Sequence, residues 1–241
     1  MSPTTEKTVR ELALESPAAT RVFEKLGIDY CCGGGQTLEQ ACRAANVTIN
    51  QVAEALAAAS QAEPATAEVR DWHAEPLSEL LAHIQRTHHV YTREEIARLG
   101  PLFDRVCSVH GANHPELMRL REVFSGLAEE LTTHMMKEEM VLFPCVLRME
   151  EAVVAKEPVL PSPFGSVRNP IRMMMYEHDG AGNALRSMRQ IANGYVPPPD
   201  ACTSFRTLYQ ALAAFEADLH QHIHLENNVL FPRAAEMEEA H

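Results

Sequence analysis

A pattern that occurs twice constrains the fold of this chain more than any other feature. The residues His-x-x-x-Glu-x-x-Val-Leu-Phe-Pro run from His134 to Pro144 and again from His222 to Pro232. On a helix, side chains four positions apart lie on one face, so each copy sets an imidazole beside a carboxylate. One such pair is commonly a solvent-exposed ion pair. Two copies in the same register instead indicate two helices that contribute to one shared site.

Helical periodicity dominates the chain from residue 75 onward and predicts an all-α fold. Apolar residues recur at helical spacing, as at Leu77, Leu80, Leu81 and Ile84. Breaks rich in Gly and Pro lie at residues 110–115, 157–170 and 193–200. We therefore predict four long helices, at about 76–109, 115–150, 171–192 and 202–236. They favour an up-down-up-down four-helix bundle over residues 75–241.

The two remaining helices each carry a histidine at the expected level of the repeated pairs. In a helical hairpin, residues at equal distances from the turn lie at the same height. His89 and His134 are equally far from residues 111–112, and His178 and His222 are equally far from residue 200. Each hairpin thus brings one more histidine level with a His-x-x-x-Glu pair. The predicted site consists of His89, His134, Glu138, His178, His222 and Glu226.

Six ionisable groups at one level of a bundle need compensation for their burial. A pair of metal ions supplies it, because carboxylates bridge two cations while imidazoles bind each one. Nitrogen and oxygen ligands without thiolate favour iron or manganese over a structural zinc site. We predict two iron ions in an oxo- or carboxylate-bridged di-iron centre. Its unfilled coordination positions suit a small ligand such as O2 or NO.

Other histidines lie near the predicted site in the sequence but not on its helix face. His88 points about 100° away from His89, and His220 and His224 are each two positions from His222. We expect surface or outer-sphere positions for these three. His110 lies at a turn and is excluded from the site, and the roles of all four remain open.

The first 61 residues predict a small helical domain. Thr8 and Glu11 match a capping box, Ser16 and Pro17 match a helix start, and Gly27 matches a helix end. Thr37 opens a further helix, and Asn50 is expected to cap a helix at 51–59. Residues 62–74, which include a polar, Ala-rich stretch with Pro64, are interpreted as a linker.

The stretch Asp-Tyr-Cys-Cys-Gly-Gly-Gly places two cysteines side by side at Cys31 and Cys32. Neighbouring cysteines cannot form a relaxed disulfide, so we interpret them as a reactive dithiol with a catalytic role. The alternative is a pair of buried structural cysteines beside a flexible turn. The other four cysteines are isolated and are expected to be small core residues.

Charge and hydropathy limit the partners. A net charge of −12 disfavours nucleic acid and anionic membrane surfaces. No apolar stretch is long enough to span a bilayer, and the first residues lack the apolar core of a signal peptide. Irregular cysteine spacing indicates reduced thiols, so the cytoplasm is the expected compartment. The oligomeric state stays open, a homodimer included.

The chain resembles the iron-sulfur cluster repair di-iron proteins, also called the repair-of-iron-centres family. The resemblance is carried by Asp-Tyr-Cys-Cys-Gly-Gly-Gly near the N-terminus and, in a hemerythrin-like bundle, by His-Met-Met-Lys-Glu-Glu, Glu-His-Asp-Gly-Ala-Gly and the second copy of the repeat. Carried over by motif, the family's metal ligands correspond to the same six residues that the spacing around the two turns predicts.

The resemblance implies that the protein restores iron-sulfur clusters damaged by nitric oxide or peroxide, by supplying iron from its di-iron site. Damaged iron-sulfur proteins would be its partners. Two alternatives remain: an enzyme that reduces NO or O2, and a sensor or carrier that binds these gases reversibly. A dithiol weighs against the carrier, because storing a gas needs no thiols.

Overall fold

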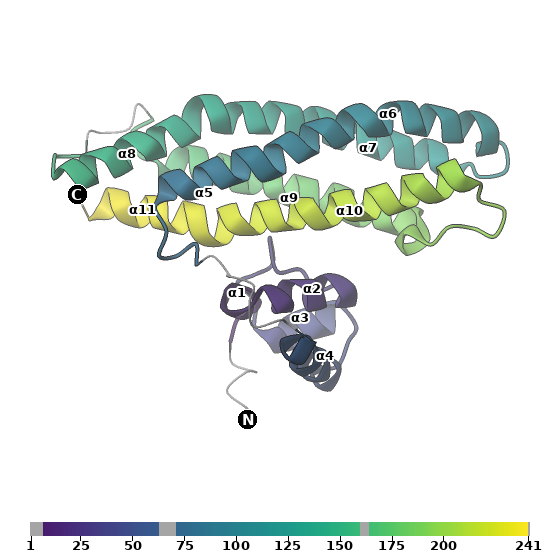
Figure 1. The fold of residues 1–241 in the computed structure, drawn as a ribbon, viewed down its shortest axis with the longest axis horizontal. Helices are drawn as coiled ribbons and strands as arrows, with labels where there is room; N and C mark the ends of the chain where they lie inside the picture. Colours follow the sequence, from purple (N-terminus) through teal and green to yellow (C-terminus); the bar gives the residue numbers. More distant parts are fainter. Residues whose placement is uncertain (1–6, 63–70, 160–163, 241) are drawn as a thin grey trace.

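The computed structural model describes residues 7–62, 71–159 and 164–240. Figure 1 shows a small group of helices beside a bundle of long ones. The small group, here called the N-terminal helices, comprises α1 (Val9–Glu15), α2 (Pro17–Leu26), α3 (Leu38–Ala44) and α4 (Ile49–Ala62). No strand is present among the described residues. The predicted all-α class is therefore confirmed.

The bundle consists of four long rods that run up and down. The first is α5 (Leu77–His83), η2 (Ile84–His89) and α6 (Val90–His110), and the second is α7 (Glu116–Lys137), η3 (Glu138–Leu142) and α8 (Phe143–Ala155). The third is α9 (Arg168–Ile191), followed by the short turn η4 (Asn193–Tyr195). The fourth is α10 (Thr203–Leu225), η5 (Glu226–Leu230) and α11 (Phe231–Glu239). All four predicted long helices exist.

Three of the rods contain a π-helical segment, η2, η3 or η5, at the height of the predicted site. Pro144 and Pro232 stand directly after two of these segments, at the second position of α8 and α11. A proline ring clashes with the carbonyl four residues earlier, and the wider π turn accommodates it without ending the rod. The Val-Leu-Phe-Pro tail of the repeat is thus a helix-distorting element beside the site.

Most predicted helix boundaries lie within a few residues of the observed ones. Helix α9 begins before Pro170, because a proline is tolerated in the first turn of a helix. The expected cap at Asn50 was wrong, since the Thr48 hydroxyl accepts from the Gln51 amide and α4 begins at Ile49. Pro101 lies inside α6, which continues through it. The predicted linker 62–74 lies largely outside the described residues.

The buried apolar side chains of the bundle form two clusters, one on each side of a polar layer. One cluster includes Phe103, Phe124 and Phe215, and the other includes Leu80 and Phe143. The polar layer between them contains the buried histidines and glutamates of the predicted site. This division confines the ionisable groups to one level of the bundle, with apolar packing above and below.

The N-terminal helices have their own core around Phe23 and Leu38 and pack against the bundle. Hydrogen bonds join the two parts, from Arg10 to Asn228, from Gln221 to Thr20 and from His220 to Glu24. Cys31 is buried within the larger bundle cluster. Among the described residues, no helix is both long and apolar enough to cross a membrane.

Candidate metal centre

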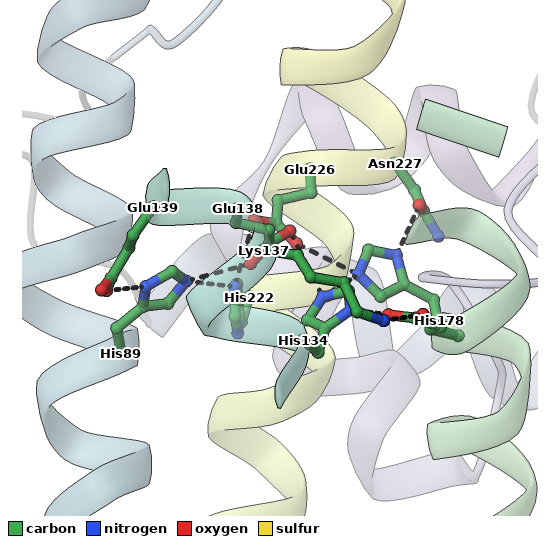
Figure 2. Close-up of polar contacts among 10 residues, drawn as sticks. His89, His134, Lys137, Glu138, Glu139, His178, His222, Glu226 and Asn227 are labelled. Atoms are coloured by element: carbon green, nitrogen blue, oxygen red, sulfur yellow. Dashed lines mark hydrogen bonds and ion pairs between the residues drawn. The ribbon is translucent and has the colours of Figure 1, made fainter. Parts of the chain in front are cut away.

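The structure brings the six predicted residues together at the middle of the bundle (Figure 2). Each of the four rods contributes at least one of them. His89 ends η2, Glu138 begins η3 and Glu226 begins η5, so three of the six belong to π-helical segments. His134, His178 and His222 come from α7, α9 and α10. All six side chains are buried.

The six residues form two overlapping groups of four, in each of which the ligand atoms lie within 4.8 Å of one another. One group is His89 and His222 with both glutamates, and the other is His134 and His178 with the same glutamates. Glu138 and Glu226 belong to both groups. The arrangement is that of two adjacent cation sites with two shared carboxylates.

The individual distances show which atoms converge. Glu138 sends one oxygen to each group, 3.3 Å from His89 Nε2 and 3.2 Å from His134 Nε2. Glu226 does the same, at 3.2 Å from His178 Nε2 and 3.2 Å from His222 Nε2. Within each group the two Nε2 atoms lie 3.2 Å or 3.0 Å apart. Nitrogen and oxygen lone pairs therefore point at two common centres.

The surroundings of the two glutamate side chains indicate whether the site fits metal ions. Both oxygens of Glu138 and both of Glu226 are buried and have no hydrogen-bond donor among the described residues. Burial of an ionised carboxylate costs roughly several kcal/mol, and the neighbouring imidazoles offset that cost only when they carry protons. Cations at the two centres remove that cost. The donor set of imidazoles and carboxylates is one that iron, manganese or zinc accepts.

Two of the histidines are held by outer carboxylates that link them to surface cations. His89 Nδ1 donates to Glu139 at 2.7 Å, and Glu139 accepts from Arg93 at 2.9 Å. His134 Nδ1 donates to Glu177 at 2.8 Å, and Glu177 is paired with Lys137. Such bonds fix the ring orientation and increase the basicity of the other nitrogen. Each Nε2 is thereby presented to its centre as a lone-pair donor.

The third outer partner is an amide. His178 Nδ1 donates to the Asn227 side-chain oxygen at 2.8 Å, and the Asn227 nitrogen donates to the Cys31 carbonyl at 3.3 Å. Sequence reasoning missed Asn227 as well as Glu139 and Glu177. Adjacency was the available signal, since Glu139 follows Glu138, Glu177 precedes His178 and Asn227 follows Glu226.

The charges of the groups are coupled. Burial opposes a charge on His134, but the carboxylates of Glu138, Glu226 and Glu177 together outweigh it and raise the pKa of His134 to about 9. Burial alone would raise the pKa of Glu226, whereas the charges of His222 and His178 lower it well below its ordinary value. The ion pairs satisfy the cluster when it holds protons, so a binding cation displaces protons.

The other histidines lie outside the two groups. Of the expected surface or outer-sphere positions, the surface one does not hold for His88 and His224, because both rings are buried. His88 donates to Asp218 at 3.0 Å and stacks on His222, with ring centroids 5.6 Å apart, which places it directly behind that ring. His224 accepts from Asn228, and His220 donates to Glu24.

The cysteine pair lies beside the site. Cys31 is buried and Cys32 is half-buried, and their sulfur atoms are 3.7 Å apart as free thiols. The hydrogen bond with Cys32, burial and the charge of Asp29 raise the pKa of the Cys31 thiol well above its ordinary value. The Cys32 thiol donates to the His178 carbonyl oxygen at 3.6 Å. The dithiol therefore touches the turn that carries one of the six residues.

A cavity of about 610 Å³ adjoins one side of the centre. His134 and His178 line it together with Lys137, Glu177 and Asp179. Its size suits a small ligand or a hydrated ion.

An all-α bundle with a buried, carboxylate-sharing histidine cluster defines a hemerythrin-like metal-binding protein. Comparison with known families agrees with this class. The hemerythrin HHE cation-binding domain matches residues 80–234, and a domain of unknown function named ScdA_N matches residues 5–60.

Curated relatives extend the match over nearly the whole chain. The iron-sulfur cluster repair protein YtfE of Pectobacterium atrosepticum is 37% identical over 229 residues, which cover 95% of this chain and 96% of the relative. The protein of the same name from Yersinia pseudotuberculosis is 38% identical over 224 residues, which cover 92% and 94%. The chain belongs to this YtfE family of iron-sulfur cluster repair proteins.

Proposed function

We propose that this protein repairs iron-sulfur clusters damaged by oxidative or nitrosative stress, and that it does so by donating iron. The iron would be held by His89, His134, Glu138, His178, His222 and Glu226 as a di-iron centre. The observation that carries the proposal is the pair of overlapping four-residue groups that share both carboxylates. The names of the relatives support the repair role.

The donor set supports release as well as storage. Imidazole and carboxylate bind iron less tightly than thiolate does, so the cysteines of a depleted client cluster would draw iron from this site. The outer bonds from Glu139, Glu177 and Asn227 keep the rings in place, while the cavity beside His134 and His178 gives iron a way out. A labile centre is thus a property of the ligand chemistry.

Cys31 and Cys32 are assigned a part in the transfer, because their loop contacts both α9 and Asn227. Thiols next to an iron store provide a binding step between the store and a client. When bound, iron supplies Lewis acidity and one-electron redox chemistry. The residues of the chain supply its position, its partial shielding from water and a nearby thiol acceptor.

Iron transfer to a client tests the proposal. The iron-loaded protein is mixed under anaerobic conditions with an iron-sulfur hydratase that has lost cluster iron. Hydratase activity should return in proportion to iron lost from the donor. The matched control is a Glu138→Ala, Glu226→Ala variant, which lacks both shared carboxylates. Donation is wrong if activity never returns while the loaded protein keeps its iron.

The second candidate is an NO- or O2-reducing di-iron enzyme, which the cavity at His134 and His178 favours because it admits small ligands. Continuous turnover of NO to nitrous oxide, with iron retained, would support this candidate. Reversible binding of the gas without turnover would instead indicate a sensor or carrier.

A further inference from the structure

The Cys31–Cys32 loop is shaped by one carboxylate. Asp29 Oδ1 accepts hydrogen bonds from the backbone amides of Cys31, Cys32 and Gly33, at 3.2, 2.9 and 3.0 Å. The same oxygen is 3.4 Å from the Cys31 sulfur. These bonds fold the loop around the carboxylate, and one ligand atom from each of the three residues lies within 4.8 Å of the others.

A cavity of about 100 Å³ adjoins these three side chains. It lies where the N-terminal helices meet the bundle, and Gly182, Arg186 and His220 complete part of its wall. Since a water molecule takes up roughly 30 Å³ in the liquid, the cavity has room for one ion with a few waters. The cavity and the three side chains that could bind a metal ion therefore lie together.

We propose that Asp29, Cys31 and Cys32 form a second metal site, separate from the buried histidine-glutamate centre, that binds one divalent ion such as Fe²⁺. As each sulfur bonds to the ion, its thiol proton leaves to solvent, so binding releases two protons and transfers no electrons. Two thiolates and a carboxylate favour iron, cobalt or zinc over magnesium or calcium. The inference that iron binds at this site on its way to a client protein rests on the proposed function.

Arg186 balances the carboxylate in the absence of an ion. Its guanidinium nitrogen lies 3.5 Å from Asp29 Oδ2, and the arginine side chain is more than half exposed. An exposed side chain moves away at little cost when a cation arrives. Arg186 thus competes with the metal for Asp29.

The site adjoins the di-iron residues without sharing any of them. The Cys32 sulfur reaches the His178 carbonyl, and a Cβ built on Gly182, one turn further along α9, would lie 3.4 Å from that sulfur. The dithiol therefore packs against the helix that carries His178.

Anaerobic titration with Co²⁺ tests the second site, because thiolate-bound cobalt shows a sulfur-to-metal charge-transfer absorption that cobalt on histidine and glutamate lacks. The expected result is a charge-transfer band whose full intensity corresponds to one thiolate-bound Co²⁺ per chain, while the histidine-glutamate centre takes up as many as two more ions without such a band. Replacing both Cys31 and Cys32 with serine should abolish the band, whereas Cys202→Ser should leave it unchanged, because Cys202 lies outside the loop and is exposed, not in the core as expected.

Two further variants keep the test informative if the double serine variant folds poorly. Asp29→Asn retains an oxygen that accepts the three amide hydrogen bonds but removes the negative charge. The Co²⁺ affinity of the site, measured from the band, should fall by about tenfold or more, because loss of an outer partner alone costs about 10–100-fold. Arg186→Gln should raise the Co²⁺ affinity of the site about two- to fivefold, because the variant lacks the surface ion pair that competes with the metal for Asp29.

A wild-type protein that binds cobalt without a thiolate band overturns the second site, as does a band that survives loss of both cysteines. Transfer to the hydratase is measured separately. If the band forms and transfer fails, the metal site stands and iron donation falls. If transfer succeeds with no band, donation stands and the second site falls.

Discussion

The Asn227 side-chain oxygen lies 2.8 Å from Nδ1 of His178, and this bond connects the metal centre to the cysteine loop. The nitrogen of the same amide donates to the Cys31 carbonyl. One side chain thus orients a predicted metal ligand and holds the loop against the bundle. The side chain of neighbouring Asn228 also holds the N-terminal part of the chain, through Tyr30 and Arg10, and its other hydrogen bond is to His224, which is not one of the six centre residues.

Asn227→Ala should therefore weaken metal binding at the centre by about 10–100-fold, as loss of an outer hydrogen bond to a ligating histidine does. It should also speed amide hydrogen exchange in residues 29–34. Asn228→Ala is the matched control, expected to speed exchange in the loop while metal affinity stays unchanged. Equal affinity in the Asn227 variant and the wild type would contradict the orienting role.

Glu139→Gln and Glu177→Gln should each weaken one of the two metal sites. Each substitution keeps an oxygen acceptor for the histidine but removes the charge that increases ring basicity, so a loss of about 10–100-fold is expected. Because His89 and His134 belong to different groups, a two-step metal titration should show one weakened step in each variant. Glu94→Gln, at an exposed position on α6, serves as the control and should change neither step.

Much of this centre follows from the sequence because the rods are nearly straight and the turns short. Equal distances of His89 and His134 from one turn, and of His178 and His222 from another, suffice to place four rings at one height. The two glutamates then follow from the four-residue spacing. In a straight helix the height of a residue is proportional to its distance from the turn along the chain. Residues at matching distances from a turn therefore lie in one layer of the bundle.

Other features have no periodic signal. The π-helical segment η2 includes both His88 and His89, and both rings are buried, although neighbouring residues of a regular helix point about 100° apart. The docking of the cysteine loop depends on single hydrogen bonds such as Asn227 to Cys31, between residues far apart in the chain. Contacts of this kind follow from the assembled surface and not from local patterns.

Stability should depend on pH through His114. Hydrogen bonds to Asp200 and Glu116 raise the pKa of His114 above its ordinary value of 6.5. When the pKa of a histidine is higher in the folded protein than in the unfolded chain, its protonation stabilises the fold. This contribution is complete at a pH below the unfolded-state pKa and is lost as the pH rises through the folded-state pKa. The free-energy difference between wild type and His114→Gln should be largest below pH 6.5 and shrink at higher pH. Urea unfolding across a pH series measures it, and a constant difference would contradict the assignment.

The apolar cluster around Phe215 should support the fold without supplying metal ligands. Phe215 is almost fully buried and packs 5.8 Å from the Phe124 ring. Phe215→Ala should lower the free energy of unfolding by about 3–5 kcal/mol, with metal content unchanged in the folded protein. Val109→Ala, at an exposed position, should change it by about 0.5 kcal/mol or less. Loss of metal from folded Phe215→Ala protein would show that the two parts of the core are coupled.

Metal analysis of protein purified without oxygen tests the central claim most directly. Two shared carboxylates and four imidazoles in two groups predict two iron ions per chain in that centre, and a Glu138→Ala, Glu226→Ala variant should lose both. Measured in a Cys31→Ser, Cys32→Ser background, in which the cysteine loop holds no iron, two iron ions per chain that are lost when both glutamates are also replaced agree with the account. Zinc at one per chain in the wild-type protein contradicts it.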